Sequence, residues 1–298
     1  MAQLIAAPVG LVVLAVLLVR ELPMDRIADH ALGVAAGVLV GMAGLEVFGS
    51  RLGLVTRLFG YRVRAITIWR IHVVTMFYYF FLPAGFGYDL VRAAKVGQAA
   101  GNATGLRLAG IASVERIAGG AGLVALLLLA LPFTKVAEDA RLPWLDPPVE
   151  VWAAGVGVAA LVAGAIYLLA RHRYPRLRLI YPAAAVSALA YALIAAGIWI
   201  AAEALGIRVS STEIVVALAG TLLFQLIPVN LIGVSFGEVA ATAIYMAYGM
   251  SRPDAVFLVT IAYLQRLAAA LVGGLLEGVD SGRWLLARRR GEPDPPSS

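Results

Sequence analysis

Residues 111–118 read Ile-Ala-Ser-Val-Glu-Arg-Ile-Ala, and residues 261–268 read Ile-Ala-Tyr-Leu-Gln-Arg-Leu-Ala. The two segments lie 150 positions apart, and four of their eight residues are identical. Each holds an arginine within an apolar stretch, where a charge costs about 2.5–3.5 kcal/mol at the centre of a membrane span. This shared arginine indicates an internal duplication; the alternative is that alanine- and glycine-rich helices simply resemble one another.

Composition places the chain in a membrane. Of its 298 residues, 61% are apolar and 14% are charged, whereas soluble domains carry about 25% charged residues. A mean hydropathy of +0.88 excludes a soluble globular enzyme. Six apolar segments have the length that a helix needs to cross a bilayer. These predicted spans are residues 4–19, 31–49, 108–133, 149–170, 180–205 and 254–276.

Two further apolar stretches, residues 66–103 and 213–251, are interrupted near their middle. Proline removes a backbone donor and glycine loosens a helix, so we expect each stretch to form two arms joined by a non-helical tip. The predicted tip residues are Pro83, Gly85 and Gly87 in the first stretch and Pro228, Gly233 and Gly237 in the second. The fold class is therefore an all-α polytopic membrane protein with six full spans and two broken re-entrant hairpins.

Arginine placement orients the chain. The loops 50–65 and 171–179 each hold four arginines and no acid, whereas 20–30 and 134–148 each hold two basic and three acidic residues. The positive-inside rule places the first pair of loops, and both termini, in the cytoplasm. The broken hairpins then enter from opposite faces of the membrane, which predicts an inverted-topology repeat.

This layout defines a single membrane domain over residues 1–282, inserted in the cell (inner) membrane. Its first repeat covers about 1–133 and its second about 149–278. Residues 283–298 combine a run of arginines with a polar, proline-rich end, and we expect a basic, disordered cytoplasmic tail.

The sequence resembles a known family at two places. Residues 81–92, Phe-Leu-Pro-Ala-Gly-Phe-Gly-Tyr-Asp-Leu-Val-Arg, with Ser-Val-Glu-Arg at 113–116, resemble the first signature of the flippase-like membrane domain of lysylphosphatidylglycerol synthases and archaeal glycosyltransferases. Residues 227–238 and 248–251 are similar to the second signature. The resemblance covers nearly the whole chain and implies lipid translocation, without the soluble aminoacyl-transferring domain.

Arginines inside the membrane are candidates for binding. A guanidinium stays charged and grips a phosphate through two parallel hydrogen bonds. Arg116 and Arg266, related by the repeat, would line a shared cavity from both sides. The alternative is internal salt bridging, of Arg116 with Asp89 or Glu115 and of Arg266 with Glu238.

Other polar residues carry two interpretations each. Asp89 and Glu238 directly follow the predicted tips. They either take up protons or hold a gate shut by pairing with arginine, or they cap the first turn of a helix. Arg92 and Lys95 either attract anionic headgroups at the cytoplasmic mouth or snorkel to the interface. His72 is more typical of a hydrogen-bonded core residue than of a proton relay.

Packing and composition leave the partners partly open. Gly33, Gly37 and Gly41 form a small-residue face that packs either within the chain or in a homodimer. The chain has no cysteine and three histidines, which argues against a metal site. No nucleotide-binding loop or catalytic signature appears, so we expect no cofactor, no enzymatic activity and no nucleic-acid partner.

The function predicted from these features is translocation of an anionic phospholipid or a polyprenyl-phosphate-linked lipid across the plasma membrane by alternating access. One alternative is an integral membrane enzyme that acts on polyprenyl-linked substrates through Asp89, Glu115 and Glu238. The other is a non-catalytic scaffold for a lipid-modifying enzyme.

The predicted topology can be tested by labelling single cysteines, since the chain has none of its own. We expect Arg57→Cys and Arg173→Cys to react only from the cytoplasm and Asp139→Cys only from outside, because arginine-rich loops stay inside. Labelling of positions 139 and 173 from the same side would rule out the inverted repeat.

Overall fold

The computed structural model describes residues 24–81, 86–101, 104–130, 164–165, 168, 175–224, 230–231 and 234–289. The regular secondary structure of these residues is helical except for one short pair of strands, and short turns and loops join the helices. The helices are α2 (Met24–Asp29), α3 (Ala31–Leu58), α4 (Ala65–Phe81), α5 (Phe86–Ala100), α6 (Gly105–Ala130), η3 (Pro175–Leu179), α8 (Ile180–Ala204), α9 (Ser211–Phe224), α10 (Phe236–Ala247) and α11 (Arg252–Arg289). The strands β1 (Asn230–Leu231) and β2 (Val234–Ser235) pair antiparallel.

Four helices are long and apolar enough to cross a membrane: Ala31–Leu58, Gly105–Leu129, Pro175–Ala204 and Arg252–Val279. An all-helical chain with four such helices is compatible with a membrane protein. These helices coincide with four of the six predicted spans. The predicted span 4–19 and the predicted external loop 134–148 lie outside the described residues. Of the predicted span 149–170, only residues 164–165 and 168 are described, and these are helical.

Two helices extend past their predicted ends. Residues 50–58, assigned to a loop, belong to α3, because Leu52 and Val55 sit at helical spacing and are fully buried. Arg51 is therefore a helical residue rather than a loop residue. At the other end of the chain, α11 continues to Arg289, so residues 283–289 of the predicted disordered tail are helical. Leucine, alanine and arginine in this segment favour a helix.

The glycine face of α3 packs within the chain. A Cβ on Gly33 would lie 2.5 Å from the Cβ of Ala204, and a Cβ on Gly37 would collide with the carbonyl oxygen of Gly197. Both contacts are with α8, whereas a Cβ on Gly41 would overlap the side chain of Gln265 on α11. Small residues thus bring the backbones of α3 and α8 together, as in closely packed membrane helices.

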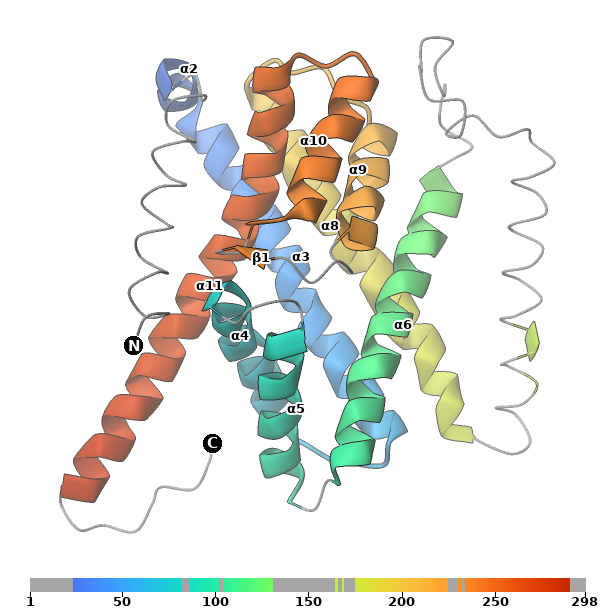
Figure 1. Ribbon diagram of the computed structural model, residues 1–298, viewed down its shortest axis with the longest axis vertical. Coiled ribbons are helices and arrows are strands. Elements are labelled where there is room, and N and C mark those ends of the chain that lie inside the picture. Colours follow the sequence, from blue (N-terminus) through green and yellow to red (C-terminus); the bar gives the residue numbers. More distant parts are fainter. Residues whose placement is uncertain are drawn as a thin grey trace.

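Both apolar stretches that the sequence predicted as broken are interrupted. The first forms α4 and α5, and the second forms α9 and α10 with the β1–β2 pair between them. In Figure 1, α4 and α5 occupy the lower half of the molecule and α9 and α10 the upper half.

The predicted tip residues divide into two groups. Pro83, Gly85, Pro228 and Gly233 lie outside the described residues. Gly87 and Gly237, predicted to be non-helical, are instead the second residues of α5 and α10. Glycine accepts helical backbone angles as well as extended ones, so the helices begin before these glycines rather than after them.

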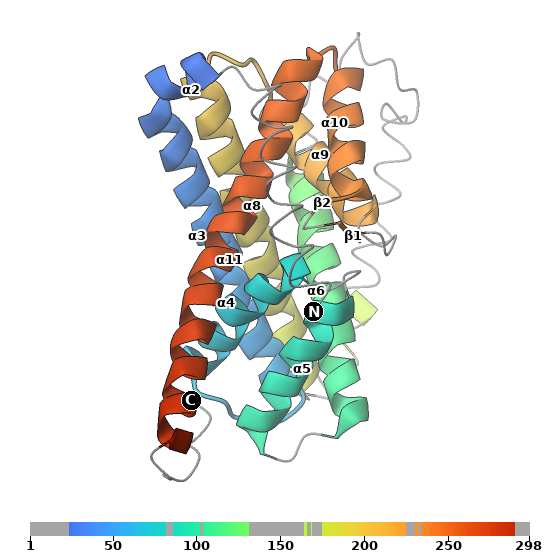
Figure 2. The ribbon, with the colours of Figure 1, turned by 60° about the vertical axis from the view of Figure 1, so that its left-hand side comes forward.

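Neighbouring helices are arranged alike in the two halves. The pair α3 and α8 lies at the centre. Helix α3 contacts α4 and α11, and α8 correspondingly contacts α9 and α6. Helix α4 contacts α11 as α9 contacts α6, and α5 contacts α6 as α10 contacts α11. Figure 2 shows α11 running the length of the molecule beside α3 and α4.

The close approach of α3 and α8 predicts that an added methyl group destabilises the protein at a glycine in the contact but not at a glycine outside it. Gly37→Ala should lower the free energy of unfolding by about 1–3 kcal/mol, because its Cβ meets the Gly197 backbone. Gly120→Ala on α6 meets nothing within 4 Å and should be neutral or stabilise by up to about 1 kcal/mol. Unfolding of purified protein in detergent measures both; equal effects would contradict the packing.

Candidate functional site

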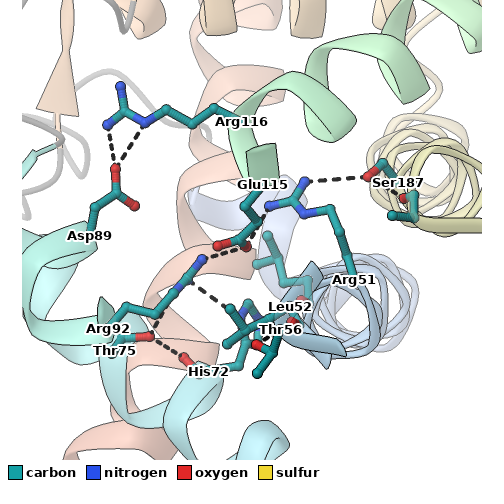
Figure 3. A network of polar contacts seen from close by, with 12 residues as sticks. Arg51, Leu52, Thr56, His72, Thr75, Asp89, Arg92, Glu115, Arg116 and Ser187 are labelled. Carbon is teal, nitrogen blue, oxygen red and sulfur yellow. Dashed lines mark hydrogen bonds and ion pairs between the residues drawn. The ribbon is translucent and has the colours of Figure 1, made fainter. Parts of the chain in front are cut away.

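Glu115 on α6 is shared by two arginines. Its side chain is 4% exposed, and Oε1 accepts hydrogen bonds from Arg51 Nη2 at 3.0 Å and from Arg92 Nη1 at 2.7 Å. Figure 3 shows the two guanidinium groups reaching this carboxylate from α3 and α5. One carboxylate balances only one of the two cations, so the group carries a net positive charge inside the protein.

Arg92 is held from several sides. Its Nε donates to Thr75 Oγ1 at 3.2 Å, Nη2 lies 3.4 Å from His72 Nδ1, and the guanidinium stacks on the Tyr88 ring at 4.7 Å. The residue is 4% exposed. Neither sequence interpretation, an interfacial mouth or snorkelling, describes this position, because Glu115 draws the side chain inward.

His72 is a hydrogen-bonded core residue, as the sequence favoured. Its Nε2 lies 2.8 Å from the carbonyl oxygen of Leu45. A carbonyl oxygen only accepts, so Nε2 carries the hydrogen and Nδ1 is free to accept from Arg92. This assigns a neutral imidazole that connects α3, α4 and α5.

Arg51 joins three helices. In addition to Glu115 on α6, its Nη1 donates to Ser187 Oγ on α8 at 3.4 Å. Its guanidinium lies 4.4 Å from the centre of the Phe48 ring on its own helix, in cation–π geometry. The third guanidinium nitrogen, Nε, is buried without a hydrogen-bond partner among the described residues.

The two arginines of the duplicated segments form matching ion pairs. Arg116 on α6 pairs with Asp89 on α5, with 2.9 Å between Nε and Oδ2. Arg266 on α11 pairs with Glu238 on α10. Each acid lies in the first turn of a helix that follows a break. These are two of the salt bridges that the sequence left open; Glu115 binds Arg51 and Arg92 instead of Arg116.

A cavity of about 190 Å³ lies between the two halves. Of the arginines described above, Arg51, Arg92 and Arg266 line it, together with Glu238. Its aromatic wall consists of Phe48, Tyr79, Tyr88, Tyr191 and Tyr245. The remaining lining is mainly aliphatic, so the cavity combines an apolar wall with cationic groups that are already held in place.

Among the charged residues that the sequence offers for headgroup binding, gating or salt bridging, Arg92, Arg266 and Glu238 line this cavity, and Arg116, Asp89 and Glu115 do not. Successive residues on a helix point about 100° apart. Glu115 faces the interior, so its neighbour Arg116 turns away, with 39% of its side chain exposed. Figure 3 shows the Arg116–Asp89 pair displaced from the shared carboxylate.

Lys95 forms a separate contact farther along α5. Its Nζ lies 3.0 Å from Glu277 Oε2 on α11, and Tyr78 on α4 donates to Glu277 Oε1 at 2.7 Å. The lysine is partly buried in this cluster and is absent from the cavity lining. It therefore ties the first broken hairpin to α11.

Sequence reasoning missed Arg51 and Gln265 as cavity residues. Arg51 was counted with loop arginines, although Leu52 and Val55 beside it have the spacing of a buried helix face. Gln265 was visible as the counterpart of Glu115 in the duplicated segment. Within the described residues no group of three or more His, Cys, Asp and Glu could hold a metal ion.

In comparisons with known proteins, no family model matches the chain, and no curated protein or solved structure matches it significantly.

Because two arginines share one carboxylate, removing Glu115 should destabilise the protein more than removing Arg51. Glu115→Gln leaves two buried guanidinium groups without their common anion and should lower the free energy of unfolding by about 3–5 kcal/mol. Arg51→Met leaves the Arg92–Glu115 pair intact and should cost about 1.5–3 kcal/mol, one charge-assisted hydrogen bond. Arg57→Met, exposed on the same helix, is the control. A larger loss for Arg51→Met than for Glu115→Gln would contradict the shared pairing.

Proposed function

We propose that this protein translocates an anionic lipid across the plasma membrane by alternating access. The observation that carries the proposal is the net positive charge of the Arg51–Glu115–Arg92 group, whose two arginines line the cavity. A buried cation surplus is costly without an anion. A phosphate headgroup supplies that anion, and a guanidinium binds it through directed hydrogen bonds.

The cavity suits a headgroup rather than a whole lipid. Its volume of about 190 Å³ is below the roughly 300–1,000 Å³ of pockets that enclose complete drug-sized ligands. A headgroup would occupy the cavity beside its arginines, while the acyl or polyprenyl chains remain in the bilayer. The substrate is accordingly an anionic phospholipid or a polyprenyl-phosphate-linked lipid.

An inverted repeat of six spans and two re-entrant hairpins would supply the movement. Three observations support it: the equivalent neighbours of α3 and α8, the placement of α4–α5 and α9–α10 in opposite halves, and the matching pairs Asp89–Arg116 and Glu238–Arg266. In transporters with such repeats, one half rocks against the other around a site near the membrane midplane. The resemblance to the flippase-like membrane domain leads to the same proposal.

The two alternative functions, a membrane enzyme and a scaffold, are less well supported by the charged residues. A membrane enzyme would use Asp89, Glu115 and Glu238 as acid or base, yet each of the three is paired with arginine. A scaffold would not require charges around a cavity. Transport is therefore the better-supported function.

The proposal is tested in vesicles that contain purified protein and a tail-labelled phosphatidylglycerol. Arg51→Ala and Arg266→Ala should slow the appearance of label in the opposite leaflet by about 10- to 100-fold, the loss of one charge-assisted hydrogen bond. Arg51→Lys and Arg266→Lys should rescue only partly, because an ammonium lacks the planar fork. Arg57→Ala is the matched control.

A second pair of variants separates headgroup binding from salt bridging. Arg116→Ala should slow transport less than Arg266→Ala, since Arg116 lies outside the cavity lining. Arg266→Met combined with Glu238→Gln restores electrical balance without a guanidinium. Normal transport by that double variant would contradict headgroup binding at Arg266.

A further inference from the structure

Gln265 occupies a niche made by two glycines at the centre of the molecule. It is 0% exposed. A Cβ on Gly41 of α3 would overlap its side chain, and a Cβ on Gly197 of α8 would lie 2.7 Å from its Nε2. Any larger residue at either glycine would displace the amide. The α3–α8 contact thus positions one polar side chain of α11.

The orientation of this amide follows from its partners. Nε2 lies 3.3 Å from the carbonyl oxygen of Gly37 and 3.5 Å from that of Ile194. Carbonyl oxygens only accept hydrogen bonds, so the NH₂ group must face them. Oε1 is consequently directed elsewhere, and it is buried with no hydrogen-bond partner among the described residues.

Gln265 lines the same cavity as Arg51, Arg92 and Arg266. The cavity lining therefore includes two kinds of group: cations that match a phosphate, and a neutral amide whose oxygen can only accept. This oxygen is covered in the present conformation, so the proposed transport movement must uncover it before a ligand can reach it. A buried acceptor without a donor is unfavourable. A ligand that supplies the donor would be favoured over one that does not.

We propose that Gln265 selects the headgroup, by accepting a hydrogen bond from an O–H or N–H donor on the same lipid whose phosphate pairs with the cavity arginines. This inference rests on the proposed lipid-binding function. It narrows the substrate to anionic phosphodiester lipids whose headgroup carries a donor beyond the phosphate.

The duplicated segment explains why an amide serves here. Glu115, the counterpart of Gln265, is fully engaged by Arg51 and Arg92. A second carboxylate at position 265 would cancel the positive surplus of the cavity. Glutamine supplies an acceptor oxygen and leaves that surplus for the phosphate.

Two lipids of equal charge test the proposal. Phosphatidylglycerol and phosphatidylmethanol are both singly charged phosphodiesters, but only the glycerol headgroup carries hydroxyl donors. We expect the purified protein to move tail-labelled phosphatidylglycerol about 5–10-fold faster, the effect of one hydrogen bond. Tail-labelled phosphatidylserine, whose donor is an ammonium, distinguishes the two donor types. Equal rates for phosphatidylmethanol and both donor-bearing lipids would overturn the inference.

Gln265→Met keeps the length of the side chain and removes the acceptor. It should reduce the preference for phosphatidylglycerol to about one, mainly by slowing that lipid. Gln98→Met, the same change at an exposed position of α5, should keep the preference. Retention of the full preference by Gln265→Met would also overturn the inference.

A binding measurement separates this inference from the transport proposal. Short-chain forms of the lipids are added to detergent-purified protein, and the shift in thermal unfolding is recorded. Greater stabilisation by phosphatidylglycerol than by phosphatidylmethanol in the unmodified protein, lost in Gln265→Met, supports selection even if no lipid crosses the vesicle membrane. Equal stabilisation of the unmodified protein by the two lipids overturns selection even if both cross. Where Gln265→Met fails to fold, the comparison within the unmodified protein decides.

Discussion

The carboxylate of Glu115 is the interaction on which the rest of the site depends. Two guanidinium groups in a nonpolar surrounding repel each other, and each would be costly to bury alone. The Glu115 carboxylate lowers the cost of burying both guanidinium groups, and its hydrogen bonds connect α3, α5 and α6. Because it cannot neutralise both, the protein keeps a positive charge where an apolar cavity also lies. The packing of these helices and the positive charge beside the cavity therefore have the same origin.

The two halves of the molecule use related residues for different purposes. Position 115 organises cations, whereas position 265 presents a neutral amide held by backbone carbonyl groups. The ion pairs Asp89–Arg116 and Glu238–Arg266 are alike in sequence spacing but differ in surroundings, since only the second borders the cavity. The two halves, similar in layout, thus border one cavity with chemically distinct sides.

The sequence predicted the helical class and the interruption of both apolar stretches, and it offered the ion pairs of Arg116 and Arg266 as the alternative to headgroup binding. These follow from hydropathy, proline and glycine placement, and the cost of buried charge, which are local or pairwise properties. It could not predict that Arg51 faces inward, because loop and helix arginines look alike until the rotation of α3 is known. It also missed that adjacent residues Glu115 and Arg116 point to different surroundings. Side-chain direction depends on tertiary packing, which the linear pattern of charges does not contain.

The glycine contact between α3 and α8 has a mechanical consequence. Where two backbones touch without intervening side chains, the helices have no soft layer through which to slide apart. In the proposed transport cycle, the crossing of Gly37 and Gly197 would act as a fulcrum, and displacement would grow with distance from it. The helix ends that lie farthest from this crossing would then move most. A small rotation at the centre would open one end of the molecule and close the other.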